Sequence, residues 1–347
     1  DVIKVGTPAG SKRVHRWPEG AAIADIALSR EVMAAARAAG VAVVPELVAV
    51  PKTPTQPALR LGNRFYDAQE WMPSAPPSPA ETSWPDADTI VDIPAVLPGA
   101  VFSAVIAAMA RLHGTTTDIA ARENIPTAPL SMLPGAVRQA HECHLRALRP
   151  RARHEPAIQR WLATGERLLA GAEPIVLDAT HAQESPPSMV HLGLWPAHVI
   201  LEHDALSGLL GWERTAAGSP LLDLAQATLR LQGWSDEVVE AAIATYADLR
   251  PLSPDERRLL PAVAALDAVA STGRLLEQTY AVDEAARPPT ALRAGIDMML
   301  RSMSALDRNL KAQASVGKSK RTPWRRGPRP TASRRESEGG KPHDRRR

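Results

Sequence analysis

Cysteine, aromatic residues and long apolar runs are all scarce in this chain of 347 residues. The single cysteine, Cys143, excludes an internal disulfide, which fits a reducing compartment. No uninterrupted apolar stretch reaches the roughly 18–20 residues that a membrane helix requires. The chain also does not begin with the basic and apolar regions of a secretory signal. These absences lead us to expect a cytoplasmic protein without membrane contact.

Acidic residues are scarce near the C-terminal end. Residues 312–347 carry a net charge of +9, which leaves −6 for the rest of a chain whose net charge is +3. The segment is rich in Arg, Pro, Ser and Gly and has no apolar period, so we expect a basic disordered tail. Its charge suits a nucleic acid or an acidic partner, although only Trp324 offers a stacking surface. The alternative is a solvated extension without a partner.

The remaining sequence divides into a small mixed region and a larger helical one. Residues 1–72 predict short strands and one helix over 21–40, which lacks interior Pro and ends at Gly40. Residues 73–98, rich in Pro, Ser, Asp and Ala, predict a linker. Residues 99–311 predict helices around short strand-like segments at 189–212, which we interpret as a hairpin. The helices are expected over 101–113, 133–148, 157–172, 223–231, 236–249, 254–280 and 289–310.

Three ordered motifs lie in and after the hairpin. Residues 191–201 read H-L-G-L-W-P-A-H-V-I-L, residues 207–213 read S-G-L-L-G-W-E, and residues 218–225 read G-S-P-L-L-D-L-A. They resemble the motifs H-G-D-L-x-P-x-N-V-L, s-g-v-I-D-W-E and G-D-P-x-x-D-L-A of the aminoglycoside-phosphotransferase and choline-kinase-like family. The resemblance extends over residues 1 to about 285. It implies an α+β, two-lobed protein-kinase-like fold, ATP and Mg²⁺ as cofactors, and a small-molecule ligand in the cleft between the lobes.

The sequence departs from the family at the positions that carry the chemistry. There, one Asp positions or accepts the proton of the acceptor hydroxyl, an Asn binds a metal ion, and a second Asp bridges metal and phosphates. The corresponding residues here are Gly193, His198 and Gly211. Glycine can neither accept a proton nor bind a cation, and Mg²⁺ prefers oxygen ligands to a histidine nitrogen. The resemblance therefore implies a family member without an intact catalytic set.

Further positions match the nucleotide side of the family's cleft. Lys4 stands where a strand lysine grips the phosphates, and Glu31 where its ion-pair partner would be. Glu70 and Met72 lie in the segment that resembles the strand lining the adenine pocket. The family's glycine-rich phosphate loop would have to precede Asp1, so we expect a truncated small lobe. Alternatively, Lys4 and Glu31 are ordinary surface charges that contact no nucleotide.

The polar residues of the motifs have structural interpretations as well. By resemblance, His191 shapes the loop through backbone hydrogen bonds, and Asp223 braces the loop. His198 is either a weak metal ligand or a polar side chain that fills an emptied site. A separate group, His141, Cys143, His144 and His154, matches no common zinc spacing.

Three hypotheses remain open. The chain is an inactive or impaired phosphotransferase relative that binds a nucleotide or a metabolite. Alternatively, it is an active ATP-dependent phosphotransferase for a small hydroxylated or aminated molecule, with Glu202, Asp204 or Glu213 as substitute groups. Finally, it is a binding protein that acts through its basic tail.

Overall fold

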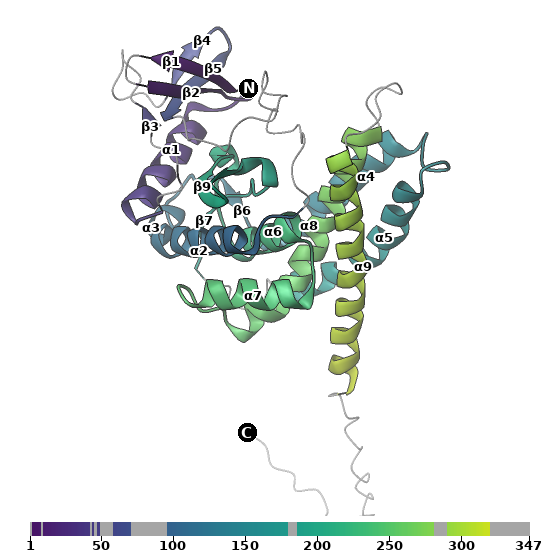
Figure 1. Cartoon of the computed structure of the whole chain (residues 1–347). Coiled ribbons are helices and arrows are strands. Elements are labelled where there is room, and N and C mark those ends of the chain that lie inside the picture. The colour runs from purple at the N-terminus through teal and green to yellow at the C-terminus, as the bar shows by residue number, and fades with distance from the viewer. Residues whose placement is uncertain are drawn as a thin grey trace, which may run out of the picture. The chain divides into compact units, whose positions relative to one another are not determined.

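An antiparallel sheet and one helix make up the small lobe (Figure 1). The strand order is β1-β2-β5-β3. Strand β4 pairs with residues 64–66 at the start of β5, whereas β3 pairs with residues 68–69 near its end. Helix α1 buries Ile26, Val32, Met33 and Ala36, the apolar stripe of its sequence, and has Gly40 with positive φ just beyond its end. The elements are β1 (Val2–Thr7), β2 (Gly10–Arg16), α1 (Ile23–Ala38), β3 (Leu47–Val48), β4 (Leu59–Leu61) and β5 (Arg64–Glu70).

This computed structural model describes residues 2–7, 10–41, 44, 47–48, 58–70, 96–179, 186–280 and 290–319. Residues 1–311 form one unit and residues 312–347 a second. The expected linker over 73–98 lies almost entirely outside the described residues, as do Met72 and most of the expected tail.

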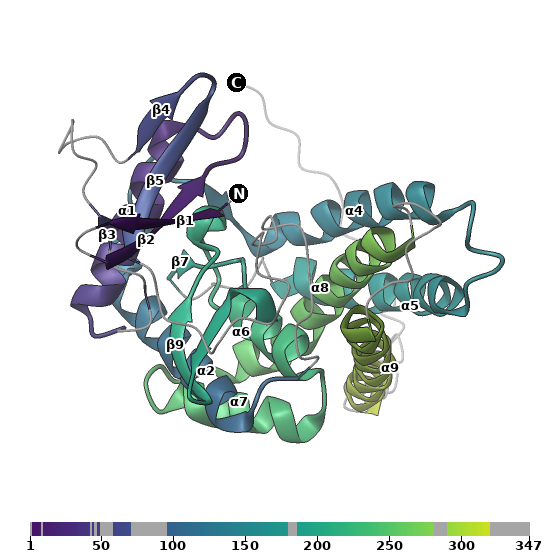
Figure 2. The same ribbon diagram turned by 45° about the horizontal axis from the view of Figure 1, so that its top comes forward.

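The large lobe is built around α8, which packs against α4, α5 and α6 (Figure 2). By length and composition α8 could cross a membrane, but 83% of its most apolar window is buried inside the protein, as in a core helix. The helices are α2 (Gly99–Thr115), α3 (Thr117–Ala120), α4 (Leu133–Leu148), α5 (Pro156–Ala179), α6 (Leu221–Ala227), α7 (Asp236–Ala247), α8 (Pro254–Tyr280) and α9 (Thr290–Ser319), with a π-helical turn η4 (Thr228–Gln232) after α6.

Short strands of the large lobe flank the three motifs, and the third motif runs into α6. Strand β10 pairs with β6 in parallel and with β7 antiparallel, whereas β8 and β9 form a separate hairpin. The bounds are β6 (Thr127–Ala128), β7 (Ser188–Val190), β8 (Val199–Glu202), β9 (Ala205–Leu209) and β10 (Ala216–Gly218), with 3₁₀ turns η1 (Leu130–Met132), η2 (Pro196–His198) and η3 (Trp212–Arg214). The fold class expected from the sequence, a small sheet-containing lobe and a larger helical lobe, is thus confirmed.

Four local expectations need correction. The Gly, Ser and Lys residues after the first strand predict a turn, but strand β2 forms there, because its polar side chains find partners on β5. Strand β7 joins β10 rather than the hairpin. Helix α5 continues to Ala179 through Pro174, since Ala172 and Val176 are buried in the core. Helix α9 continues to Ser319, nine residues beyond the predicted end at 310; the added segment contains good helix formers and no proline.

Candidate functional site: a closed catalytic-type loop

Asp223 holds the loop that follows β7. Its Oδ2 accepts a hydrogen bond from the backbone N–H of His191 at 2.6 Å, and its Oδ1 accepts one from Leu192 N–H at 2.8 Å. His113 from α2 approaches Oδ2 through Nε2 at 3.0 Å, and both side chains are fully buried. Burial alone would raise the pKa of Asp223, but His113 and the loop amide outweigh it and lower the pKa below its ordinary value. Asp223 is therefore an ionised brace beneath the loop.

The brace explains an unusual backbone conformation at Leu192. This residue has φ +58°, a left-handed conformation that costs a non-glycine residue roughly 1–2 kcal/mol. The family motif has glycine at this position. Here the Asp223 hydrogen bond fixes the turn although leucine occupies it.

His191 turns back onto its own loop. Its Nδ1 accepts a hydrogen bond from Gly193 N–H at 3.1 Å, so the proton of the neutral ring sits on Nε2. The ring also makes an edge contact with Trp212, at 4.6 Å between centroids. Complete burial lowers the pKa of His191 to about 4. A neutral, internally bonded imidazole of this kind shapes the loop and does not face a ligand.

The two glycines at the expected aspartate positions lie against each other and against His198. A Cβ atom placed on Gly193 would stand 2.5 Å from the carbonyl oxygen of Gly211. A Cβ placed on Gly211, which has φ +86°, would stand 2.5 Å from Nδ1 of His198. That Nδ1 donates a hydrogen bond to the carbonyl oxygen of Gly193. The imidazole therefore fills the space beside Gly211, and neither position has room for even the first atom of an aspartate side chain.

Glu213 is a second acidic residue of the motifs and follows Trp212, which packs against His191 of the loop. Burial raises the pKa of Glu213, but His15, His198 and Arg13 lower it by a larger amount. The net shift of this pKa is therefore downward. Two of these groups, Arg13 and His15, come from β2 of the small lobe. The carboxylate of Glu213 is therefore ionised at neutral pH.

The nucleotide-side residues are only partly brought together. Lys4 lies in β1, opposite Arg13 in the strand register. Glu31 is exposed and its carboxylate pairs with Arg122 of the large lobe at 2.7 Å. Glu70 ends β5.

The other sequence-predicted candidates are scattered. His141 is buried against Trp161, His144 pairs with Glu277, and Cys143 is exposed. Among the described residues, no three His, Cys, Asp or Glu side chains stand close enough to hold a metal ion. Glu202 and Asp204 lie at the tip of the β8–β9 hairpin, outside the closed loop.

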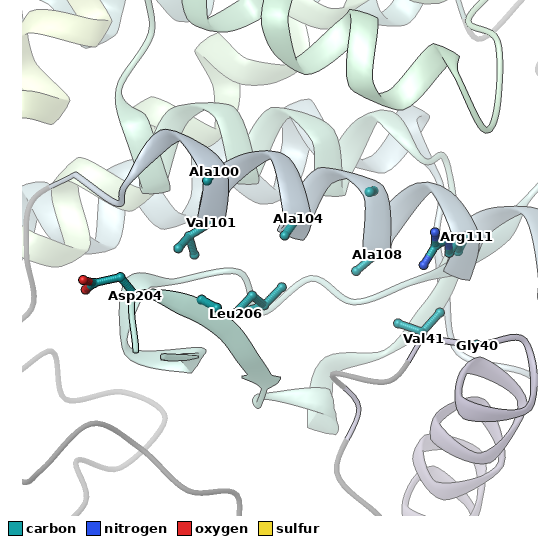
Figure 3. Close-up of a pocket in the computed structure, with 11 residues that line it drawn as sticks. Gly40, Val41, Ala100, Val101, Ala104, Ala108, Arg111, Asp204 and Leu206 are labelled. Carbon is teal, nitrogen blue, oxygen red and sulfur yellow. The ribbon is translucent and has the colours of Figure 1, made fainter. Parts of the chain in front are cut away.

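A groove of about 460 Å³ lies between α2 and the β8–β9 turn (Figure 3). Alanine side chains of α2 form one wall, and Leu206 and Val41 face them. Asp204 and Arg111 stand toward opposite ends. None of the motif residues His191, Gly193, His198 and Gly211 lines this groove.

The model of the phosphotransferase enzyme family matches residues 1–266. The chain belongs to this family. No curated protein sequence matches this family member.

Solved structures with the same fold include three phosphotransferases, all of low sequence identity. An aminoglycoside phosphotransferase from Alicyclobacillus acidocaldarius superposes with a TM-score of 0.56 at 14% identity, over 91% of this chain and 90% of that one. A spectinomycin phosphotransferase in complex with ADP and spectinomycin gives 0.55 at 10% identity, over 88% and 89%. Choline kinase LicA from Streptococcus pneumoniae gives 0.51 at 13% identity, over 88% and 90%. At these identities the likeness shows the fold alone.

Enzymes of this family generally use ATP with Mg²⁺, so the motif residues can be compared with the ligands that Mg²⁺ requires. Mg²⁺ needs oxygen ligands in near-octahedral geometry. The motif positions supply two glycines and a histidine whose Nδ1 is engaged with Gly193. The residues present therefore do not fit the metal.

Sequence reasoning missed the small-lobe groups around this site. Arg13 and His15 were not among the predicted site residues, because their segment is polar and only its pairing with β5 makes it a strand. The glycine-to-leucine change at Leu192 was also visible in the motif.

Proposed function

We propose that this phosphotransferase-family protein does not transfer phosphate and acts as a binding protein that retains the fold. The observation that carries the proposal is the packing of Gly193, His198 and Gly211 against one another, which leaves no room for a carboxylate. Phosphoryl transfer depends on positioning and on neutralising charge between phosphates through metal ions. A loop that provides neither a base nor a metal ligand lacks both contributions.

The packing supports the proposal in a second way, because the space beside the loop is filled and not empty. Replacing Asp by Gly alone would leave space beside the loop. Here an imidazole occupies that space, and its hydrogen bond ties the two halves of the loop together. Asp223 and His113 still hold the loop in place. We infer that the loop has kept its structural role while its chemical role has gone.

The test is ATP turnover by the whole protein with a panel of acceptors, namely an aminoglycoside, choline and a small amino alcohol, with ADP release as the readout. We expect turnover no faster than the solvent background, and nucleotide binding, measured by calorimetry, that is indifferent to Mg²⁺. Turnover with a defined acceptor at ordinary enzyme rates of about 1–100 s⁻¹ would overturn the proposal. If that turnover were then lost in Glu213→Gln, Glu213 would be the substitute group.

A gain-of-function variant sharpens this test. Restoring Gly193→Asp is blocked by the backbone, because its Cβ would stand 2.5 Å from the carbonyl oxygen of Gly211. The clash at Gly211 is with the imidazole of His198, so the matched variant combines Gly211→Asp with His198→Asn, which shortens the side chain and supplies an oxygen ligand. Any Mg²⁺-dependent nucleotide binding should appear in this double variant and not in Gly211→Asp alone.

A further inference from the structure

The turn that joins α4 to α5 is strongly basic, although the folded part of the chain is acidic. Residues 146–160, called the arginine turn below, hold five arginines against one acidic residue and so carry a net charge of +4. Because residues 1–311 together carry −6, the rest of that unit carries −10. Figure 2 shows the turn at the edge of the large lobe. Its arginines are Arg146, Arg149, Arg151, Arg153 and Arg160.

Three guanidinium groups of the arginine turn have no partner among the described residues. Arg149, Arg153 and Arg160 are exposed, and no carboxylate or other acceptor of the described chain contacts their side chains. An exposed arginine elsewhere behaves differently, since Arg122 pairs with Glu31 at 2.7 Å. The arginine turn therefore presents positive charge that the acidic body around it does not neutralise.

The backbone that carries these arginines is ordered. Leu148 and Ile158 are buried on the two sides of the turn. Between them, Arg151 N–H donates to the carbonyl oxygen of Leu148 at 3.0 Å, and His154 N–H donates to that of Arg151 at 3.0 Å. Pro150 restricts the backbone further. A ligand therefore does not have to order this segment in order to bind, which lowers the entropic cost of binding.

Helix electrostatics explains only part of the cluster. Arg146 lies in the last turn of α4 and Arg149 caps that helix, where a cation interacts favourably with the helix dipole. Arg153 lies between the two helices, and Arg160 lies beyond the first turn of α5, at the end where the dipole is positive. These two arginines gain nothing from a helix terminus.

The surroundings of the arginine turn favour a short acidic ligand. A guanidinium can donate two parallel hydrogen bonds to one carboxylate, and arginine clusters recognise acidic motifs in this way. A nucleic acid duplex is a long and dense polyanion that would extend beyond the turn, where the net charge of −10 repels it. Residues 146–160, all of which the structure describes, expose no large apolar side chain for insertion into a lipid surface.

We propose that the arginine turn is a docking surface for a short acidic segment of a partner protein. Arg149, Arg153 and Arg160 are the residues that bind its carboxylates. The proposal goes beyond the proposed function, because this surface lies outside the motif loop and binds its partner whether or not the loop transfers phosphate.

Backbone NMR of the full chain, titrated with a hexaglutamate peptide, tests the docking surface. We expect the amide signals of residues 149–154 to shift with added peptide at about 50 mM salt. The shifts should fade toward about 500 mM salt, because salt screens exposed charges. Shifts confined to residues 320–347 would overturn the proposal, since the basic tail would then be the binding segment. The absence of any shift at 50 mM salt would overturn it as well.

Charge reversal shows whether the arginines themselves bind the peptide. Arg149→Glu with Arg153→Glu should weaken the affinity read from these shifts by about tenfold or more. The matched control is Arg257→Glu with Arg258→Glu, which makes the same change in net charge at two exposed residues of α8 and should leave the affinity within about twofold. Equal losses in both variants would mean that net charge alone governs binding, and the proposal would be wrong.

A DNA duplex of about 20 base pairs is the second probe in the same titration. We expect it to leave the signals of residues 149–154 in place. If the duplex shifted these signals at a lower concentration than hexaglutamate, and Arg149→Glu with Arg153→Glu removed that effect, the partner would be a nucleic acid and the proposal would fail.

Discussion

The imidazole of His198 donates from Nδ1 to the carbonyl oxygen of Gly193, and the same nitrogen stands where a Cβ on Gly211 would have to go. Three residues that a motif comparison treats as separate losses are therefore one packed unit. The change at each position fits the changes at the other two. This coupling makes the loop's stability, and not only its chemistry, depend on glycine at positions 193 and 211.

The first prediction is that Gly211→Ala destabilises the protein by about 2–4 kcal/mol. Part of the cost comes from placing a side chain at φ +86° and part from the contact with His198. Urea unfolding measures the change in free energy. The control is Gly135→Ala in α4, where an added Cβ meets nothing within 4 Å, and which should be neutral or stabilising by up to about 1 kcal/mol.

The contact with His198 can be separated from the backbone strain. His198→Ala removes the imidazole, so Gly211→Ala should cost less in that background than in the wild type. An identical cost in both backgrounds would mean that backbone strain alone is responsible.

The second prediction concerns the brace beneath the loop. Asp223→Asn should lower the free energy of unfolding by about 3–5 kcal/mol, because an amide nitrogen would then face a backbone N–H or His113 in a fully buried site. Asp204→Asn at the exposed hairpin turn should stay within about 0.5 kcal/mol. Chemical denaturation of the two variants gives the comparison, and similar midpoints would refute the structural role of Asp223.

The motif sequences predicted the braced loop, while the small-lobe side of the site escaped prediction. Asp223 and His191 follow from the resemblance of their motifs to those of the family, which implies that His191 shapes the loop and that Asp223 braces it. Arg13 and His15 could not be placed in the same way. Their strand is polar, and only pairing with Gln69 and Asp67 on β5, more than fifty residues away, makes it a strand.

Helix ends likewise depend partly on local sequence signals and partly on tertiary packing. The range predicted for α8, 254–280, agrees with its described bounds. The end of α5 was placed too early because Pro174 is a strong local signal, and burial of Val176 against the core overrides it. The packing of His198 against Gly193 and Gly211 likewise depends on the tertiary structure, and no single motif position predicts it.

The third prediction concerns the basic segment. From its composition, we expect truncation after Ser319 to leave the melting temperature of the folded part nearly unchanged, and any affinity for nucleic acid to be lost with the segment. In the full chain such affinity should fall steeply as salt rises from about 50 to 200 mM, because phosphate contacts release counterions. Calorimetry and a fluorescent oligonucleotide give the two readouts. A large drop in melting temperature would show that the segment belongs to the fold.

The last prediction is an acid sensitivity centred on buried histidine. Burial lowers the pKa of His191 to about 4 in the folded protein, whereas the side chain of an unfolded chain titrates near 6.5. The unfolded state therefore binds a proton before the folded state does. The stabilising contribution is complete above about pH 6.5 and is lost as the pH falls toward 4, by up to about 3 kcal/mol for this one group. Burial also lowers the pKa of His141 and His198, so these groups add to the loss of stability at low pH.

Urea midpoints of the wild type and of His191→Asn, measured from pH 8 to pH 4, isolate the contribution of His191. The stability difference between them should be constant above about pH 7 and should shrink steadily below about pH 6.5, because the variant no longer takes up this proton on unfolding. A difference that stays constant down to pH 4 would mean that His191 titrates at the same pH in both states, and that the loop is open to water.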